Sequence, residues 1–293
     1  MKKILFVGLG LIGGSMALAL EGYPDVECYA TTRSEVTRAE ALRRGAVKAA
    51  WPTPKEAPLD QMDVVWLCLP PEACVDFVNR YGMRLAKGSL LTDVCGVKQP
   101  LRAAVNALQD RPFRYLGGHP MAGRERGGFV NATADLFRGA HYILTPDDQT
   151  DERDVALITS LVTHMGCADI VRTNPEAHDA RIAYTSQLMH VMALALCENP
   201  LLMDSYGFEG GSFRGATRVA ALEPDLWCEL FWANKGVLKE QVDDLIRHLT
   251  DYSELLAGDD RPALLARLTE SSDRKKDFDQ LRGLTGAKAP MFK

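Results

Sequence analysis

His119 lies in the run GGHPMAGRERGG (Gly117–Gly128), at the end of a stretch with the pattern of a β-strand. Imidazole has an ordinary pKa of about 6.5, so histidine is the usual general base at neutral pH. The glycines around His119 leave room for a substrate to approach. Open α/β folds bind their ligands at the carboxyl ends of their strands, and this position therefore predicts a catalytic base. The alternative is a histidine that only hydrogen-bonds a loop.

Three polar residues lie on one predicted helix, seven and four residues apart: Asp179, Ser186 and His190. At about 100° per residue they share one face, although most of their neighbours are apolar. Such a stripe is costly in an apolar environment unless it meets polar groups, so these side chains are candidate substrate contacts. A structural hydrogen-bond set is the alternative. We expect no metal site, because neither H-x-x-x-H spacing nor a nearby acidic ligand set occurs.

Basic residues supply candidate anion contacts. Arg214 and Arg218 lie four apart in GFEGGSFRGATRVA and would point the same way in a helix, where guanidinium groups can hold carboxylates. Asp93 and Lys98 lie in TDVCGVK, after another predicted strand, and could contact substrate or cofactor. The alternatives are surface arginines, a helix N-cap and a helix-surface charge.

A glycine motif, GxGxxG, stands between a predicted strand and a predicted helix near the start of the chain. Gly8 can make the tight turn, Gly10 lets the backbone approach a pyrophosphate, and Gly13 lets the helix pack on the strand. The alternative is a glycine-rich turn without a ligand. The predicted cofactor contacts are Gly8, Leu9, Gly10, Leu11, Ile12, Gly13, Thr32, Arg33, Ser34, Cys68, Leu69, Pro70 and Asp93.

The end of the second strand carries the residues that distinguish NAD from NADP. An acidic residue there would bind the ribose 2′-hydroxyl of NAD. This chain has Thr32, Arg33 and Ser34 instead, and an arginine beside hydroxyl groups suits a 2′-phosphate. NADP is therefore favoured, while NAD stays possible because Glu35 could be the acid if the register shifts.

The elements that must position these residues alternate in type over the first half of the chain. Short apolar runs separated by helical stretches are typical of a parallel, doubly wound α/β sheet. After about residue 173 only helical patterns follow, so we predict a dinucleotide-binding Rossmann-type domain over residues 1–172 and an all-α domain over residues 173–293. The predicted strands are Lys3–Gly8, Val26–Thr31, Met62–Pro70, Ser89–Cys95, Arg114–His119, His141–Pro146 and Ala168–Thr173. The predicted helices include Leu11–Glu21, one from Ser34 to Gly45, and about Pro175–Asn199, Pro224–Leu249 and Pro262–Leu281.

Composition narrows the functional class. The 293 residues are 46% hydrophobic and 25% charged, with a net charge of −5, so we expect no nucleic-acid partner. No apolar run is long enough for a membrane span, and we expect no membrane partner. The seven cysteines are scattered, which argues against a disulfide framework or a zinc site and favours the cytoplasm.

The motifs together, in this order, resemble the prephenate/arogenate dehydrogenase family of tyrosine biosynthesis. The resemblance covers nearly the whole chain and is carried by VGLGLIGGS, DVCGVK, GGHPMAGRERGG, HDARIAYTSQLMH, GGSFRGATRVA and EPDLWCELFWANKGVL. It implies oxidative decarboxylation of prephenate to 4-hydroxyphenylpyruvate, or of arogenate to tyrosine, with hydride transfer to NAD(P). It also implies that the helical domain forms a homodimer and completes the active site.

The resemblance implies roles for individual residues. His119 corresponds to the catalytic base, His190 to a substrate contact and Arg218 to the arginine that holds the ring carboxylate. Glu125 corresponds to an acidic residue at the active-site entrance, and Asp179 to the acid of a His-Asp pair. The predicted substrate-binding residues are therefore His190, Arg218, Arg214, Glu125, Asp179, Gly96 and Ser186.

One position departs from the family, and two other readings stay open. Many members have a serine within DxxSVK, near the catalytic histidine, where this chain has Gly96. A water, a backbone N–H or another side chain must then take the part of that serine. One alternative is a β-hydroxyacid-type NAD(P)-dependent dehydrogenase, with Lys98 as the nearest candidate for its catalytic lysine. The other is a catalytically inactive, cofactor-binding paralogue.

Overall fold

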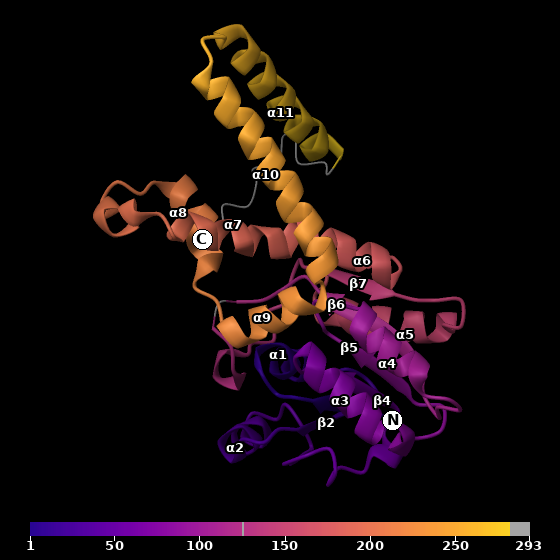
Figure 1. Ribbon diagram of the computed structural model, residues 1–293. Helices are drawn as coiled ribbons and strands as arrows, with labels where there is room; N and C mark the ends of the chain where they lie inside the picture. The colour runs from indigo at the N-terminus through magenta and orange to yellow at the C-terminus, as the bar shows by residue number, and fades with distance from the viewer. Residues whose placement is uncertain (125, 282–293) are drawn as a thin grey trace. The chain divides into compact units, whose positions relative to one another are not determined.

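The computed structural model describes residues 1–124 and 126–281, which form two compact units: Met1–Leu238 and the residues from Lys239 onward (Figure 1). The described part of the first unit contains an eight-stranded sheet in the order β3-β2-β1-β4-β5-β6-β7-β8. The strands are β1 (Lys2–Val7), β2 (Val26–Thr31), β3 (Ala49–Trp51), β4 (Val64–Leu67), β5 (Leu90–Asp93), β6 (Arg114–Pro120), β7 (His141–Thr145) and β8 (Asp169–Arg172).

Helices cover both faces of this sheet, because its strands are apolar on both sides. Ile4 and Phe6 of β1 point into a cluster with α1, α2 and α5, whereas Leu5 and Val7 point into a second cluster with α3 and α4. Alternate residues of one buried strand thus supply two cores, as a doubly wound sheet requires. The prediction of a Rossmann-type domain is confirmed. These helices are α1 (Leu11–Ala19), α2 (Glu35–Arg43), α3 (Pro71–Tyr81), α4 (Gln99–Ala107) and α5 (Glu152–His164).

Two features of the sheet differ from the prediction. β3 is an extra edge strand of three half-buried residues, too short to give an apolar run that stands out in the sequence. β7 pairs with β6 in the antiparallel direction, while every other neighbouring pair of these strands is parallel. A parallel connection needs a crossover, usually a helix. The described residues between β6 and β7 contain only one short 3₁₀ turn, Phe129–Asn131.

After β8 the elements are helical, which confirms the predicted order of an α/β part followed by an α part. Asn174 caps the first of these helices by accepting a hydrogen bond from the Ala177 N–H at 2.7 Å, and Pro175 takes its first position. The helices are α6 (Pro175–Ile182), a π-helical stretch (Ala183–Gln187), α7 (Leu188–Cys197), α8 (Gly211–Thr217), α9 (Pro224–Ala233), α10 (Lys235–Ala257) and α11 (Arg261–Leu281).

The helix predicted over Pro224–Leu249 is broken. Asn234 separates α9 from α10, and its side chain is buried at this break. The domain boundary at residues 172 and 173 remains a prediction, since the division into compact units falls after Leu238. Among the helices of the described ranges, none is both long and apolar enough to cross a membrane.

Candidate active site

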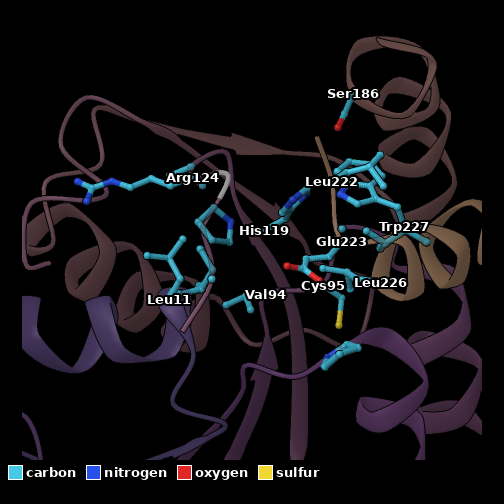
Figure 2. Close-up of a pocket in the computed structure, with 18 of the residues that line it drawn as sticks. Leu11, Val94, Cys95, His119, Arg124, Ser186, Leu222, Glu223, Leu226 and Trp227 are labelled. Atoms are coloured by element: carbon cyan, nitrogen blue, oxygen red, sulfur yellow. The ribbon is translucent and has the colours of Figure 1, made fainter. Parts of the chain in front are cut away.

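A pocket of about 610 Å³ lies at the carboxyl edge of the sheet, within the first unit (Figure 2). Its walls come from the turn between β1 and α1, the ends of β4, β5 and β6, the π-helical stretch, α7 and the segment 218–230. Figure 2 shows His119 and Leu11 on one side of the cavity and Leu222 and Trp227 on the other. Residues far apart in the sequence thus share one space.

The turn between β1 and α1 has the form of a phosphate cradle. Gly8 has φ +104°, and a Cβ there would lie 2.5 Å from the Cys68 carbonyl oxygen. A Cβ on Gly13 would lie 2.2 Å from the Gly8 carbonyl oxygen, whereas nothing lies within 4 Å of a Cβ on Gly10. The first turn of α1 has neither a side-chain cap nor an acidic residue, so its N–H groups can serve an anion. These residues fit the pyrophosphate of a dinucleotide.

The other predicted cofactor residues, in the glycine turn and in the segment after β4, occupy different places. Leu11, Ile12, Cys68, Leu69 and Pro70 line the pocket together with Gly10. Leu9 is buried in the core below it. Gly8 and Gly13 shape the turn rather than the pocket wall.

At the end of β2, the three residues predicted to choose the cofactor lie outside the pocket wall. Arg33 is exposed, and the Ser34 hydroxyl accepts a hydrogen bond from the Thr37 N–H at 3.1 Å, as the predicted helix N-cap. Arg38 was not anticipated. Its Nη1 donates to the carbonyl oxygens of Thr32 at 2.7 Å and Arg33 at 2.9 Å. Arg38 therefore fixes the backbone that presents these side chains.

His119 is the outer member of a hydrogen-bonded relay. Its Nδ1 lies 2.9 Å from Nε2 of His178, and Nδ1 of His178 lies 2.7 Å from Oδ1 of Asp179. The Asp179 carboxylate also accepts from the backbone N–H groups of Lys98 at 2.8 Å and Gln99 at 3.0 Å, at the start of α4. The relay thus ends in the Asp179 carboxylate, which α6 carries and the start of α4 binds.

The direction of the relay assigns the tautomer of each histidine. A carboxylate only accepts hydrogen bonds, so His178 donates to Asp179 from Nδ1, and its Nε2 accepts from Nδ1–H of His119. The lone pair of His119 is then left on Nε2. This nitrogen lies 4.0 Å from the position of a Cβ on Gly96, a residue of the pocket wall.

Burial keeps this histidine neutral. It lowers the pKa of His119 well below the ordinary value, and the neighbouring His178 and Lys98 lower the pKa further. Burial also lowers the pKa of His178, partly opposed by its hydrogen bond to Asp179. A neutral imidazole with a free lone pair facing the pocket can act as a general base.

Asp93 and Lys98 form a fully buried ion pair beneath the pocket wall. The Lys98 ammonium donates to Asp93 and to the carbonyl oxygen of Gly118, the residue before His119. Asp93 further accepts from the Tyr115 hydroxyl at 3.0 Å. Lys98 therefore positions the backbone of His119. It is buried beneath the pocket wall, where it could not serve as the catalytic lysine of a β-hydroxyacid-type dehydrogenase. Asp93, predicted as a cofactor contact, is occupied by the same buried network.

The three polar residues predicted to share one face of the long helix do not all face the pocket. Ser186 and His190 line the pocket, whereas Asp179 points to the start of α4. The intervening π-helical stretch, Ala183–Gln187, takes more residues per turn than an α-helix and changes the angle between the faces before and after it. His190 donates from Nδ1 to the Ser186 carbonyl oxygen at 2.9 Å and stacks on Trp227, with ring centroids 3.5 Å apart.

The two arginines are separated as well. Arg218 lines the pocket, while Arg214 lies on the exposed side of α8 and does not line it. α8 ends at Thr217 and Arg218 begins a 3₁₀ turn, so a spacing of four no longer places both on one face. Glu125 lies outside the described residues.

Gly96 lies in the pocket wall at the place where the family resemblance implies a serine. A Cβ there would lie 3.4 Å from Cδ2 of Leu230 and 4.0 Å from Nε2 of His119. A hydroxyl on that Cβ would be within reach of His119. In this chain the glycine leaves the space beside Nε2 open.

Sequence reasoning missed several residues that build the site. His178 carried no signal except its place before Asp179. Asn234 donates to the Asp179 carbonyl oxygen at 2.9 Å and to Oε1 of Gln187 at 2.8 Å, which ties the start of α10 to the relay helix. Trp227, which stacks on His190, lies within the motif EPDLWCELFWANKGVL, which predicts only a helix. The described ranges contain no group of three or more side chains that could hold a metal ion.

Comparison with known proteins agrees with this geometry. The profile of the prephenate dehydrogenase nucleotide-binding domain matches residues 16–171, and that of the prephenate dehydrogenase dimerization domain matches residues 174–270. The chain is 32% identical over 279 residues to a cyclohexadienyl dehydrogenase of Zymomonas mobilis, covering 92% of this chain and 94% of that protein. It is 29% identical to a prephenate dehydrogenase of Bacillus subtilis, covering 92% of this chain and 74% of that protein.

Two solved structures are similar over almost their full length. One is the prephenate dehydrogenase of A. aeolicus in complex with hydroxyphenyl propionate and NAD+, with a TM-score of 0.84, 26% identity and coverage of 95% and 99%. The other is the arogenate dehydrogenase of Synechocystis, with a TM-score of 0.79, 26% identity and coverage of 94% and 99%. The chain belongs to the prephenate dehydrogenase family and is an NAD(P)-dependent dehydrogenase of tyrosine biosynthesis.

Proposed function

We propose that the chain oxidatively decarboxylates a cyclohexadienyl substrate, prephenate or arogenate, with His119 as the base and NAD(P) as the hydride acceptor. The observation that carries this proposal is the relay from Asp179 through His178, which leaves the lone pair of His119 Nε2 facing the pocket. The glycine turn at the same pocket supplies the place for a dinucleotide.

In the proposed reaction His119 Nε2 takes the proton of the ring hydroxyl at C4, while a hydride leaves the same carbon. The turn from Gly8 to Gly13 would hold the dinucleotide, which would supply the hydride acceptor. The bond from C1 to its carboxylate then breaks, carbon dioxide leaves, and the electron pair enters the ring. His119 returns its proton to the C4 oxygen, which becomes the phenol. Because aromatisation drives the reaction, the protein needs only a base, correct positioning and anion contacts.

Residues of the helical wall hold the substrate in this proposal. Arg218 takes the ring carboxylate, since a guanidinium can bind it in a bidentate manner. Ser186 contacts the substrate from the π-helical stretch, and His190 contacts it from α7. The stacking on Trp227 fixes the plane of the His190 ring. Arg214 has no assigned part within one subunit, because it lies off the pocket wall.

NADP is the proposed cofactor. Arg33 is exposed at the end of β2 and free to meet a 2′-phosphate, and Arg38 holds the carbonyl groups of Thr32 and Arg33 so that the loop keeps its shape. No acidic residue stands at the tip itself; Glu35 lies in the first turn of α2. Arg33→Ala is therefore expected to reduce kcat/KM for NADP about 10- to 100-fold and to leave that for NAD nearly unchanged.

We also propose a cytoplasmic homodimer formed through the helical part. The match to the dimerization domain over residues 174–270 supports the dimer, as do exposed apolar side chains such as Met203, Tyr206 and Phe208. All seven cysteines are free thiols, which suits a reducing compartment.

A two-by-two comparison tests the function: prephenate or arogenate, each with NAD or NADP, followed by carbon dioxide release and cofactor reduction. The proposal predicts both signals in equal amounts with at least one substrate, and faster turnover with NADP. Reduction of cofactor by a small β-hydroxyacid without carbon dioxide would support the second enzyme class instead. Binding of cofactor without turnover of either substrate would support an inactive paralogue.

A further inference from the structure

Glu223 places a carboxylate in the pocket wall that the proposed reaction does not use. It stands beside the apolar residues Leu222, Leu226 and Trp227, and Figure 2 shows its carboxylate turned into the cavity. Glu223 is exposed, and among the residues that the structure describes its side chain makes neither a hydrogen bond nor an ion pair with another group.

The backbone explains why this side chain points away from its own helix. Glu223 is the N-cap of α9, with φ −81° and ψ 105°, and its carboxylate makes no cap hydrogen bond. Pro224 follows and restricts Glu223 to extended backbone, which fixes the direction of its Cα–Cβ bond. Short residues such as Asp, Asn, Ser and Thr are preferred for capping, whereas the longer Glu reaches past the helix end.

Arg218, whose charge is opposite to that of Glu223, lies on the same wall of the pocket. Arg218 precedes Glu223 by five residues and also lines the pocket. In the proposed substrates, C1 of the ring carries both the ring carboxylate and the side chain, while the reacting hydroxyl is across the ring at C4. If Arg218 takes the ring carboxylate, the side chain leaves the same tetrahedral carbon, at the end of the ring away from the C4 hydroxyl. Figure 2 shows Glu223 on the side of the cavity away from Leu11.

The two candidate substrates differ at this place. The side chain of prephenate is a keto acid, and that of arogenate is an amino acid with an ammonium group. Near a carboxylate an ammonium gains a charge-assisted hydrogen bond, whereas a keto oxygen has no hydrogen to donate.

We propose that Glu223 is a specificity-determining residue that binds the α-ammonium group of the substrate and makes the enzyme prefer arogenate to prephenate. This inference rests on the proposed function. It assigns no role in proton or hydride transfer to Glu223, so the substitution of this residue should act on one substrate and spare the other.

The test compares Glu223→Gln with a control, Asp225→Asn, which removes a charge from the same helix end but not from the pocket wall. In Glu223→Gln, kcat/KM for arogenate is expected to fall about tenfold or more, mainly through KM, while kcat/KM for prephenate stays within about threefold or rises. Asp225→Asn should leave the ratio of the two unchanged. An equal loss on both substrates, or a wild-type enzyme that prefers prephenate, overturns the proposal.

A binding measurement separates specificity from turnover. Calorimetry with oxidised cofactor present compares L-tyrosine with 4-hydroxyphenylpyruvate, which share the ring and differ in the same amino or keto group. Glu223→Gln should weaken tyrosine about tenfold and leave 4-hydroxyphenylpyruvate unchanged. Equal weakening of both ligands would contradict the assignment. If the wild type turns over neither prephenate nor arogenate, the proposed function itself fails, which is a different outcome from the loss of selectivity.

Discussion

At the scale of single residues, burial makes His119 a base at neutral pH. Because its pKa lies well below the ordinary value of about 6.5, the imidazole is neutral above that lowered pKa and becomes protonated only at lower pH. Activity that needs the neutral form should be constant through neutral pH and fall only at a pH well below the ordinary value of about 6.5. The acid limb of kcat/KM against pH, measured with saturating cofactor, reports this titration. An inflection near or above 6.5 would contradict the role of burial.

The replacement His119→Asn removes the base and keeps a polar side chain of similar size. We expect kcat to fall by about 10² to 10⁴, with a modest change in substrate KM, because the lost interaction belongs to proton transfer. Steady-state kinetics with an unchanged thermal unfolding curve would check this. Turnover close to the wild-type rate in the variant would remove His119 as the base.

The relay predicts that His178 acts only through His119. His178→Ala removes the acceptor that holds the proton on Nδ1 of His119, so kcat should fall about 10- to 100-fold. A double-mutant cycle gives the decisive measurement, because His178→Ala should have almost no further effect on kcat in the His119→Asn background. If the two losses multiply, His178 supports the fold rather than the tautomer of the base.

At the scale of elements, two glycines of the turn between β1 and α1 have different roles, one in packing and one in cofactor binding. A Cβ on Gly13 would strike the Gly8 carbonyl oxygen, whereas a Cβ on Gly10 would meet open space. Gly13→Ala should therefore cost about 1–3 kcal/mol or more and lower the Tm by several degrees. Gly10→Ala should keep most of the Tm but lose the rise that saturating NADP gives to the wild type, because its methyl group fills the path of the pyrophosphate. Thermal shift with and without cofactor distinguishes the two, and a full cofactor-induced rise in Gly10→Ala would contradict the cradle.

Local signals predicted those elements whose causes are local. Ser34 and Pro175 marked helix starts correctly because a cap and a fixed φ act within one turn, and the glycine motif could be placed because a strand and a helix flank it. The direction of β7 and the break at Asn234 depend on partners distant in the sequence, and no local pattern records them.

The same limit applies to the site, where residues in motifs could be predicted and residues whose role depends on distant partners could not. His119, His190 and Arg218 stand in motifs and line the pocket, and the resemblance named them. The α-helical angle of 100° per residue failed for Asp179, because a π-helical stretch intervenes and the sequence gives no sign of it. His178 was missed for a related reason, since its role depends on the approach of β6 to α6, a contact made only in the folded chain.

At the scale of the whole molecule, the helical part leaves large apolar side chains exposed. Met203, Tyr206 and Phe208 are 85%, 91% and 89% exposed in the single chain and lie close together in the sequence, and exposed apolar patches mark interaction sites. A homodimer that covers this segment predicts twice the chain mass of 32.3 kDa by light scattering at micromolar concentration.

Phe208→Glu should shift the mass toward the monomer by placing a charge in an apolar interface. The control is Val36→Glu in α2, a residue that is 80% exposed but lies in the Rossmann-type part, and it should leave the mass unchanged. A monomeric wild type would refute the dimer, and an unshifted Phe208→Glu would exclude this segment from its interface.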